Sequence, residues 1–281
     1  MRMDSLEARA ELAEEAGELE NALDLWGELA AREREPDYYC RYGLVAERLE
    51  RWDEAEKAYS EALRLEPDNS AAMQAMGDLW ARRSDKEESE SFAVAKDWFL
   101  RALKHERTAR VLTFLGSTYA ALDDLERARA SFEEAISLDP VYSEALYNLA
   151  ALEEKANPQR ATDLLIRAVD VDPEYSLAHQ LLGRIYHRGK DPARAEYHYR
   201  RSLGADPADY WSNIYLANFL GAQGRDEEAE RIYRFATDLH PEIEGGRKLF
   251  VRFLGSIGKP EEAAKLLASR SPDLPPSTRR D

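Results

Sequence analysis

The feature that most constrains this chain is a small residue that returns at a nearly constant interval. The repeats align on eight alanines, each followed four residues later by a bulky side chain. These alanines are Ala22, Ala55, Ala95, Ala128, Ala161, Ala195, Ala229 and Ala263. Successive alanines lie 33 or 34 residues apart, apart from one interval of 40. Such a period indicates a repeat architecture, in which each unit packs mainly against its neighbours.

Other small residues and prolines recur around each alanine with helical spacing. Gly77 and Gly116 fall in the middle of predicted helices, where glycine costs about 1 kcal/mol relative to alanine. That cost is offset where two helices approach closely. Prolines such as Pro140 and Pro173 follow the second helix of a unit, which they can terminate. Each unit is therefore predicted to contain two amphipathic helices packed across small residues.

This pattern resembles the tetratricopeptide repeat, which has small residues where its two helices cross, an aromatic ring beside them and a closing proline. Residues 109–140 match almost throughout, with Gly116, Ala128, Phe132 and Pro140 in the corresponding places. The resemblance covers about residues 5–270. It implies an all-α fold, a right-handed α-solenoid or superhelix of about eight helix-turn-helix repeats. It also implies that the first helices line a concave groove for a peptide or a partner domain.

The predicted organisation is a single solenoid domain over residues 1–270, followed by a flexible C-terminal tail at residues 271–281. The predicted repeats occupy residues 3–35, 36–69, 70–108, 109–141, 142–175, 176–209, 210–243 and 244–270. The third repeat is longer because of the polar insertion at residues 84–91. We expect this insertion to be a mobile loop between two helices, either a tolerated surface insertion or a partner contact.

The charge of the chain limits its partners. With 39 Lys and Arg against 55 Asp and Glu, the net charge is −16, which disfavours binding to nucleic acid. Residues 1–175 carry a net charge of −18 and residues 176–281 a net charge of +2, so the two parts favour different partners. The first residues lack the apolar run of a signal peptide, and no stretch is apolar enough to insert into a membrane. We therefore expect a cytoplasmic protein.

Basic and aromatic residues gather on the predicted first helices of the last three repeats. The candidate binding residues are Arg184, Arg188, Trp211, Tyr215, Asn218, Lys248 and Arg252, and the same register turns His187 and Ile214 inward. Arg184, Asn218, Lys248 and Arg252 occupy places similar to those of the carboxylate-clamp residues in chaperone-binding tetratricopeptide domains. There, Lys and Arg hold the terminal carboxylate of a peptide, through charge-assisted hydrogen bonds. Gln180 and Tyr215 depart from that set, and a solvated helix face is the alternative interpretation.

No catalytic constellation and no cofactor site is predicted. Cys40 has no identifiable histidine partner, so it is expected to be an inert packing residue. His187 and His198 fall on opposite helices of one repeat, which leaves a metal site open beside the interpretation as ordinary surface histidines.

The sequence thus predicts a non-catalytic scaffold or adaptor that binds another protein or a peptide, with an acidic ligand or a free C-terminal carboxylate favoured. A second possibility is a regulatory subunit, docked stably on an enzyme or effector through the acidic N-terminal half. A third is a scaffold that assembles end to end with its own copies. The oligomeric state is left open.

Overall fold

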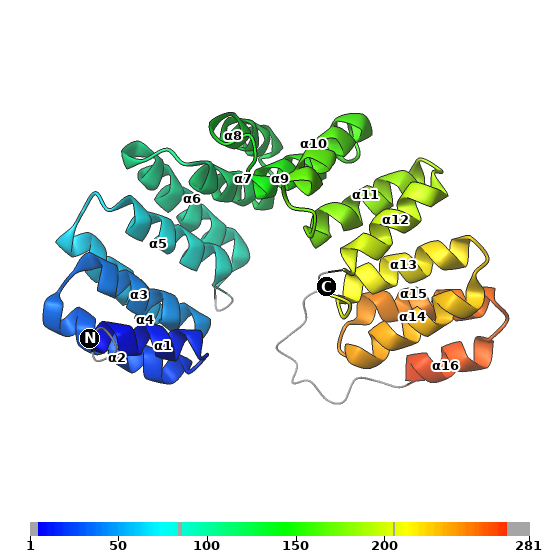
Figure 1. Ribbon diagram of the computed structural model, residues 1–281, viewed down its shortest axis with the longest axis horizontal. Helices are drawn as coiled ribbons and strands as arrows, with labels where there is room; N and C mark the ends of the chain where they lie inside the picture. The colour runs from blue at the N-terminus through cyan, green and yellow to red at the C-terminus, as the bar shows by residue number, and fades with distance from the viewer. Residues whose placement is uncertain (1–4, 84–85, 205, 269–281) are drawn as a thin grey trace. The chain divides into compact units, whose positions relative to one another are not determined.

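The computed structural model describes residues 5–83, 86–204 and 206–268, and in these ranges all regular structure is α-helical (Figure 1). The first half of the chain contains α1 (Leu6–Glu15), α2 (Leu19–Glu33), α3 (Pro36–Arg48), α4 (Trp52–Leu65), α5 (Ser70–Arg82), α6 (Glu88–His105), α7 (Ala109–Ala121) and α8 (Leu125–Leu138). The second half contains α9 (Ser143–Glu153), α10 (Pro158–Val171), α11 (Ser176–Arg188), α12 (Pro192–Ser202), α13 (Tyr210–Ala222), α14 (Asp226–Leu239), α15 (Glu244–Ser256) and α16 (Pro260–Ala268). No described helix is long and apolar enough to span a membrane.

The eight repeated alanines all lie in even-numbered helices, and all are buried. In four of the pairs, the odd-numbered helix brings a glycine against the ring that follows the alanine, as at Gly43, Gly77, Gly116 and Gly183. A Cβ atom at Gly116 of α7 would lie 2.5 Å from Cε1 of Phe132 in α8, and a Cβ at Gly77 would lie equally close to Phe99. Since real Cβ atoms do not approach a ring so closely, a glycine is required for each ring to pack. The predicted helix pairs are confirmed.

Local sequence explains where several helices of the second unit begin. Asn157 caps α10, its side chain accepting a hydrogen bond from the backbone N–H of Arg160 at 3.2 Å, and Pro158 occupies the first turn. Asp191 caps α12 in the same way, and Asp209 accepts from the N–H of Ser212 at the start of α13. Side-chain caps of this kind satisfy amide groups that have no partner inside the helix.

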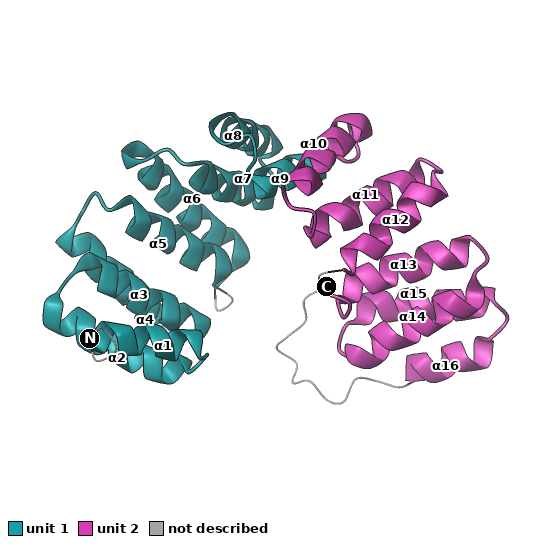
Figure 2. Ribbon diagram, viewed as in Figure 1, with its two compact units in different colours: residues 1–152 teal, residues 153–281 magenta. Residues whose placement is uncertain are grey.

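Two compact units divide the chain, Met1–Leu152 and Glu153–Asp281 (Figure 2). Trp26, Tyr59 and Leu79 lie in the core of the first unit. Tyr199 and Tyr233 lie in the core of the second, together with phenylalanines of α13 and α15. The predicted single domain over residues 1–270 concerns how the units are joined, and it stays a prediction.

The expected loop at residues 84–91 is wrong in its second half. Residues 84 and 85 lie outside the described ranges, but α6 already begins at Glu88, and Ser91 is buried. The acidic residues of this segment stand at the N-terminus of α6, where negative charge favours a helix. The polar composition therefore starts a longer helix. The predicted tail at residues 271–281 lies outside the described residues.

Candidate functional site

The seven predicted binding residues lie on the odd-numbered helices of the second unit. Arg184 and Arg188 belong to α11, Trp211, Tyr215 and Asn218 to α13, and Lys248 and Arg252 to α15. Helix α13 contacts both α11 and α15. We call the surface formed by these seven residues the odd-helix face.

The structure gives Arg184 and Arg188 a partner that the sequence did not reveal. Glu154, in the turn after α9, is only 7% exposed, and its Oε1 accepts from Nη2 of Arg188 at 2.7 Å and lies 3.1 Å from Nη2 of Arg184. The second oxygen of Glu154 accepts from Arg184 at 3.2 Å. Two guanidinium groups thus bind one carboxylate, and this neutralises a buried charge that would otherwise be costly.

Aromatic rings continue this charged cluster along α13. The guanidinium carbon of Arg184 lies 5.5 Å from the ring centroid of Tyr215, a cation–π distance. Trp211 lies 6.0 Å from Tyr215 between ring centroids and is 39% exposed. A Cβ at Gly245 would lie 2.8 Å from the indole of Trp211, so the glycine at the start of α15 makes room for this ring. Arg184, Tyr215 and Trp211 therefore form a continuous cation–aromatic surface.

The remaining three candidates stand apart from this surface. Asn218, Lys248 and Arg252 are exposed, and Lys248 forms only an ion pair of 3.4 Å with Glu244, one turn earlier on α15. Among the described residues, no hydrogen bond or ion pair joins these three side chains to Glu154 or to the arginines of α11. The structure thus joins four of the seven predicted residues.

Two residues expected to face inward belong elsewhere. Ile214 is fully buried in the core of the second unit. His187 packs edge-on against Tyr199 and Phe219, and burial lowers its pKa. One helical turn holds three or four residues, so an error of one position in the predicted register exchanges the exposed face of a helix for its buried side.

The metal site left open at His187 and His198 is not formed by these two side chains, because His198 meets His179 instead. Their Nδ1 atoms are 2.9 Å apart, and Nε2 of His179 lies 3.1 Å from the carbonyl oxygen of Pro173. That carbonyl can only accept, so Nε2 of His179 donates, its Nδ1 accepts, and Nδ1 of His198 donates. Burial, together with the neighbouring His179, lowers the pKa of His198 to about 4. In the described residues, no cluster of three or more His, Cys, Asp or Glu could hold a metal.

The first unit carries acidic groups on its odd-numbered helices. Glu47 of α3 is buried, accepts from the hydroxyl of Tyr59, and forms an ion pair of 3.0 Å with Arg82 of α5. Burial raises the pKa of Asp78 to about 6, against the hydrogen bond from Gln74 and the charge of Arg82. Burial also raises the pKa of Cys40 to about 11, which keeps it a thiol at neutral pH.

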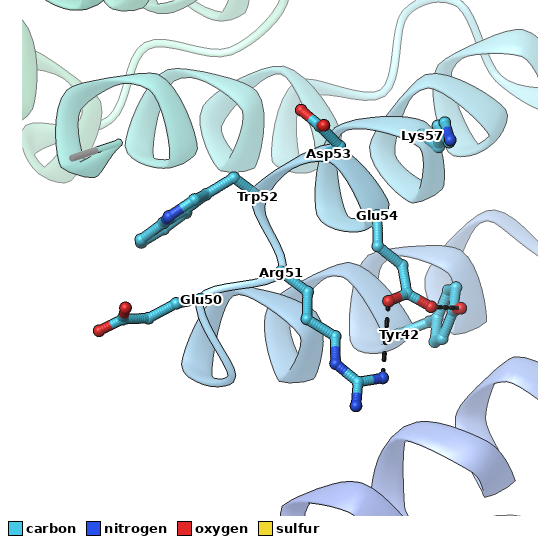
Figure 3. A pocket seen from close by; sticks show the side chains of 7 residues that line it. All are labelled: Tyr42, Glu50, Arg51, Trp52, Asp53, Glu54 and Lys57. Carbon is cyan, nitrogen blue, oxygen red and sulfur yellow. Dashed lines mark hydrogen bonds and ion pairs between the residues drawn. The ribbon is translucent and has the colours of Figure 1, made fainter. Parts of the chain in front are cut away.

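A surface cavity of about 690 Å³ lies beside the start of α4 (Figure 3). Part of its charged lining is paired within the protein. Tyr42 donates to Glu54, and Arg51 lies 3.7 Å from Glu54 and 2.6 Å from Glu20. In Figure 3, Trp52 points away from this group. Because Arg51 and Glu54 already pair with each other, these two groups offer little to a charged ligand.

Three segments of the chain match descriptions of the tetratricopeptide repeat. They cover residues 36–69, 109–142 and 151–210. The first two fall on the helix pairs α3–α4 and α7–α8, and the third spans α10 to α12.

Solved structures with the same fold resemble most of the chain. The crystal structure of the APC/C hetero-tetramer Cut9–Hcn1 matches with a TM-score of 0.72 and 17% identity, over 90% of this chain and 49% of that one. PilF of Pseudomonas aeruginosa gives 0.66 and 16% over 79% and 99% of the two chains. PilW, a widely conserved type IV pilus biogenesis factor, gives 0.64 and 17% over 76% and 97%. At these identities the likeness shows the fold alone.

One curated protein matches over a short segment. Residues of this chain are 42% identical, over 66 positions, to the protein O-mannosyl-transferase Tmtc2 of Drosophila melanogaster. The match covers 24% of this chain and 6% of that protein, so the chain spans a small part of this relative and about half of the Cut9–Hcn1 chain.

Proposed function

The chain is an all-α tetratricopeptide-repeat solenoid, and from this we propose that it is a non-catalytic scaffold whose odd-helix face binds a partner protein or an extended peptide. The favoured ligand is acidic, or ends in a free carboxylate. The proposal includes a cytoplasmic location and involves neither nucleic acid nor a cofactor. It rests on the residues of the second unit, since a fold alone does not fix a function.

The observation that carries the proposal is the contact between Glu154 and the two arginines of α11. A glutamate carboxylate sits between Arg184 and Arg188 at 3.1 and 2.7 Å. These arginines therefore have the spacing that a carboxylate requires. Tyr215 and Trp211 extend the site with ring surface suited to apolar side chains of a peptide.

The same contact determines how a ligand would bind. A carboxylate approaching Arg184 has to compete with Glu154, which is attached to the protein and already in place. Lys248 and Arg252 on α15 are exposed, and the only carboxylate that Lys248 pairs with among the described residues is Glu244, an exposed side chain of the same helix at 3.4 Å. We therefore assign the main contact with an acidic ligand group to α15, and the contact with its apolar side chains to Trp211.

The proposal is tested with displayed random peptides that keep a free C-terminus. Peptides selected on the wild-type protein are measured against the double variant Lys248→Ala with Arg252→Ala. We expect affinity to fall about tenfold, because two charge-assisted contacts are lost. The matched control, Arg231→Ala with Lys265→Ala, removes the same charge from exposed positions on even-numbered helices. Equal affinity of all three proteins, with unchanged helicity, contradicts the proposal.

Glu154→Gln gives a second, opposite test. The amide is nearly the same size as the carboxylate but loses the charge that neutralises Arg184 and Arg188. We expect this variant to bind acidic peptides several-fold more tightly than wild type, by about half to one kcal/mol. Weaker or unchanged binding in an isothermal titration would place the arginines in a purely structural role.

The acidic N-terminal half supports a second candidate function, that of a regulatory subunit docked stably on an enzyme or effector. Residues 1–175 carry a net charge of −18, and such a field favours a basic partner surface. Size-exclusion chromatography with light scattering distinguishes these possibilities. A soluble monomer supports the adaptor, and aggregation that co-expression of a partner relieves supports the subunit. A mass that grows with concentration supports end-to-end assembly.

A further inference from the structure

The even-numbered helices of the second unit are joined by charged side chains at a recurring place. Between α12 and α14, Nη2 of Arg200 lies 2.8 Å from Glu196 and 2.9 Å from Glu228. Arg225, just before α14, lies 2.7 Å from Glu196 and also pairs with Glu228. Two cations and two carboxylates alternate, so each charge has two opposite neighbours.

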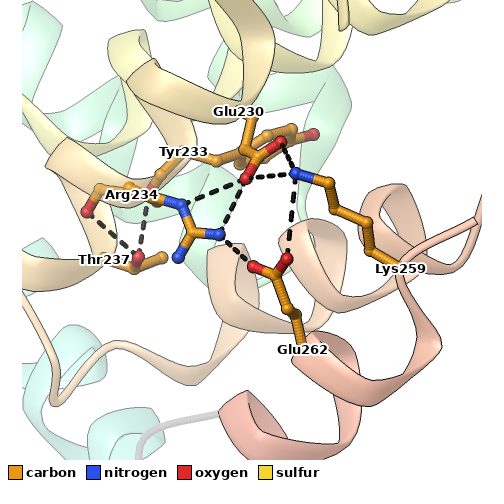
Figure 4. Close-up of polar contacts among 6 residues, drawn as sticks. All are labelled: Glu230, Tyr233, Arg234, Thr237, Lys259 and Glu262. Carbon is orange, nitrogen blue, oxygen red and sulfur yellow. Dashed lines mark hydrogen bonds and ion pairs between the residues drawn. The ribbon is translucent and has the colours of Figure 1, made fainter. Parts of the chain in front are cut away.

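The same network recurs between α14 and α16 (Figure 4). Arg234 lies 2.7 Å from Glu230 and also pairs with Glu262, while Nζ of Lys259 lies 2.8 Å from Glu230 and 3.8 Å from Glu262. Each of the four positions lies 34 residues after its equivalent in the preceding network. The α12–α14 and α14–α16 junctions are therefore both closed by the same arrangement of charges.

The α10–α12 junction, 34 residues earlier, lacks this network. The places of Glu196 and Arg200 are taken by Thr162 and Ile166, and the places of Arg225 and Glu228 are taken by Asp191 and Arg194. Two charges are lost and two are reversed, so the bridging arginine has no counterpart. A cavity of about 700 Å³ lies here, lined by Thr162, Ile166, Ile185, Tyr186, Arg188 and Arg194 among others.

We propose that this cavity, the α10–α12 pocket, binds a peptide segment of a partner protein in which a large apolar side chain is flanked by Asp or Glu. Ile166 is 39% exposed, and it stands beside Ile185 and Tyr186 in the lining. These groups offer apolar surface to the side chain, whose transfer from water supplies the favourable free energy.

The charged lining determines the sign of the ligand. Of the lining carboxylates, Glu154 is held by Arg188 at 2.7 Å, and Asp163 accepts from Gln159 at 2.9 Å. Arg194 lies over the ring of Tyr186 at 5.4 Å and has only a long ion pair of 3.6 Å with Asp191. In the two closed junctions, the equivalent position is a glutamate that forms an ion pair with an arginine. Arg194 places a cation there, and its long ion pair with Asp191 leaves the guanidinium able to bind a carboxylate of an acidic peptide.

This pocket goes beyond the function proposed above, because α10, the end of α11 and the start of α12 line it, while Trp211, Lys248 and Arg252 do not. Arg188 belongs to both sites, but Lys248 and Arg252 lie outside the pocket, and Thr162, Ile166 and Arg194 lie outside the odd-helix face, so variants of these residues test one site without the other. A ligand with a free C-terminus is expected on the odd-helix face, whereas the pocket takes an internal segment.

The test fills the pocket with the charged residues that stand at the equivalent positions of the closed junctions. The graft variant carries Thr162→Glu, Ile166→Arg and Arg194→Glu, which copies the arrangement around Arg234 and keeps Asp191 as the cap of α12. Random peptides displayed internally, without a free C-terminus, are selected on wild-type protein and counter-selected on the graft variant. We expect enriched peptides to contain an aliphatic or aromatic residue beside Asp or Glu, and to bind the graft variant at least about tenfold more weakly.

A milder variant keeps the test valid if the graft variant does not fold. Ile166→Ser with Arg194→Gln removes the apolar and the cationic contact, and its matched control, Leu239→Ser with Arg231→Gln, removes the same groups from exposed sites on α14. Weaker binding by the first variant alone supports the pocket. The proposal is overturned if no peptide distinguishes the proteins, if the enriched peptides are basic, or if wild-type protein forms oligomers that the graft variant does not.

Discussion

The α10–α12 and α14–α16 junctions occupy equivalent places two repeats apart, yet one is a pocket and the other is closed by charges. Ile166 and Arg234 hold equivalent positions 68 residues apart. Arg234 reaches Glu230 and Glu262, whereas Ile166 lines a cavity and is partly exposed. Both junctions stand on helix pairs with a buried alanine at the crossing, Ala161 and Ala229. The difference shows that side chains outside the repeat signature decide whether a junction is filled.

The largest predicted change in the free energy of unfolding comes from packing within a helix pair. Gly116→Leu places a side chain where even a Cβ would lie 2.5 Å from Phe132, so we expect a loss of about 1–3 kcal/mol in the free energy of unfolding. Gly255→Leu is the matched control, because a Cβ there would meet no described atom within 4 Å beyond its chain neighbours and the backbone of its own helix. Chemical denaturation followed by circular dichroism measures both. If the two variants unfold alike, the assigned register of the pairs is wrong.

A smaller effect compares the two junctions directly. Arg234→Ala removes ion pairs to Glu230 and Glu262 and a contact with the ring of Phe250 at 5.6 Å, so we expect a cost of about 1 kcal/mol. Ile166→Ala, at the equivalent position, removes a side chain that lines a cavity, and the expected cost is under about 0.5 kcal/mol. If Arg234→Ala and Ile166→Ala destabilise the protein equally in thermal unfolding, the distinction between a closed and an open junction is removed.

The smallest predicted effect is a pH dependence confined to the closed junctions. The hydrogen bond from Lys259 lowers the pKa of Glu230 from its ordinary 4.5, and the hydrogen bond from Arg200 lowers that of Glu228. A lowered folded-state pKa gives stability that is present above 4.5 and is lost as the pH falls through the folded value. The difference in melting temperature between wild type and Glu230→Gln should therefore disappear in acid. The small difference in melting temperature between wild type and Ile166→Ala should stay constant as the pH falls. If it also disappears in acid, the pH dependence does not come from the ion pairs of the closed junctions.

Much of the fold was predictable from the sequence because its determinants are local. Ala128, Phe132 and Gly116 meet within one helix pair, and helical periodicity fixes which of their sides face each other. The start of α6 was not predictable from composition, because Glu88 and its acidic neighbours suit a loop and the first turn of a helix equally well.

The candidate site was predictable only in outline. Periodicity indicated that Arg184 and Arg188 share a side of α11, but not that Glu154 reaches them from a turn about 30 residues earlier. His179 was missed as the partner of His198 for the same reason, since the contact depends on how two helices cross. Comparing equivalent positions in successive repeats could have revealed the missing network at Thr162 and Ile166 before the structure was known.

The most direct test of this account is a crystal structure of the graft variant. We expect the arginine introduced at position 166 to lie 2.8–2.9 Å from both introduced carboxylates, as Arg200 does with Glu196 and Glu228, with α10 and α12 unmoved and the cavity filled. If the three side chains instead extend into solvent and the cavity remains, the identity of these residues does not decide whether the junction is open, and the account is wrong.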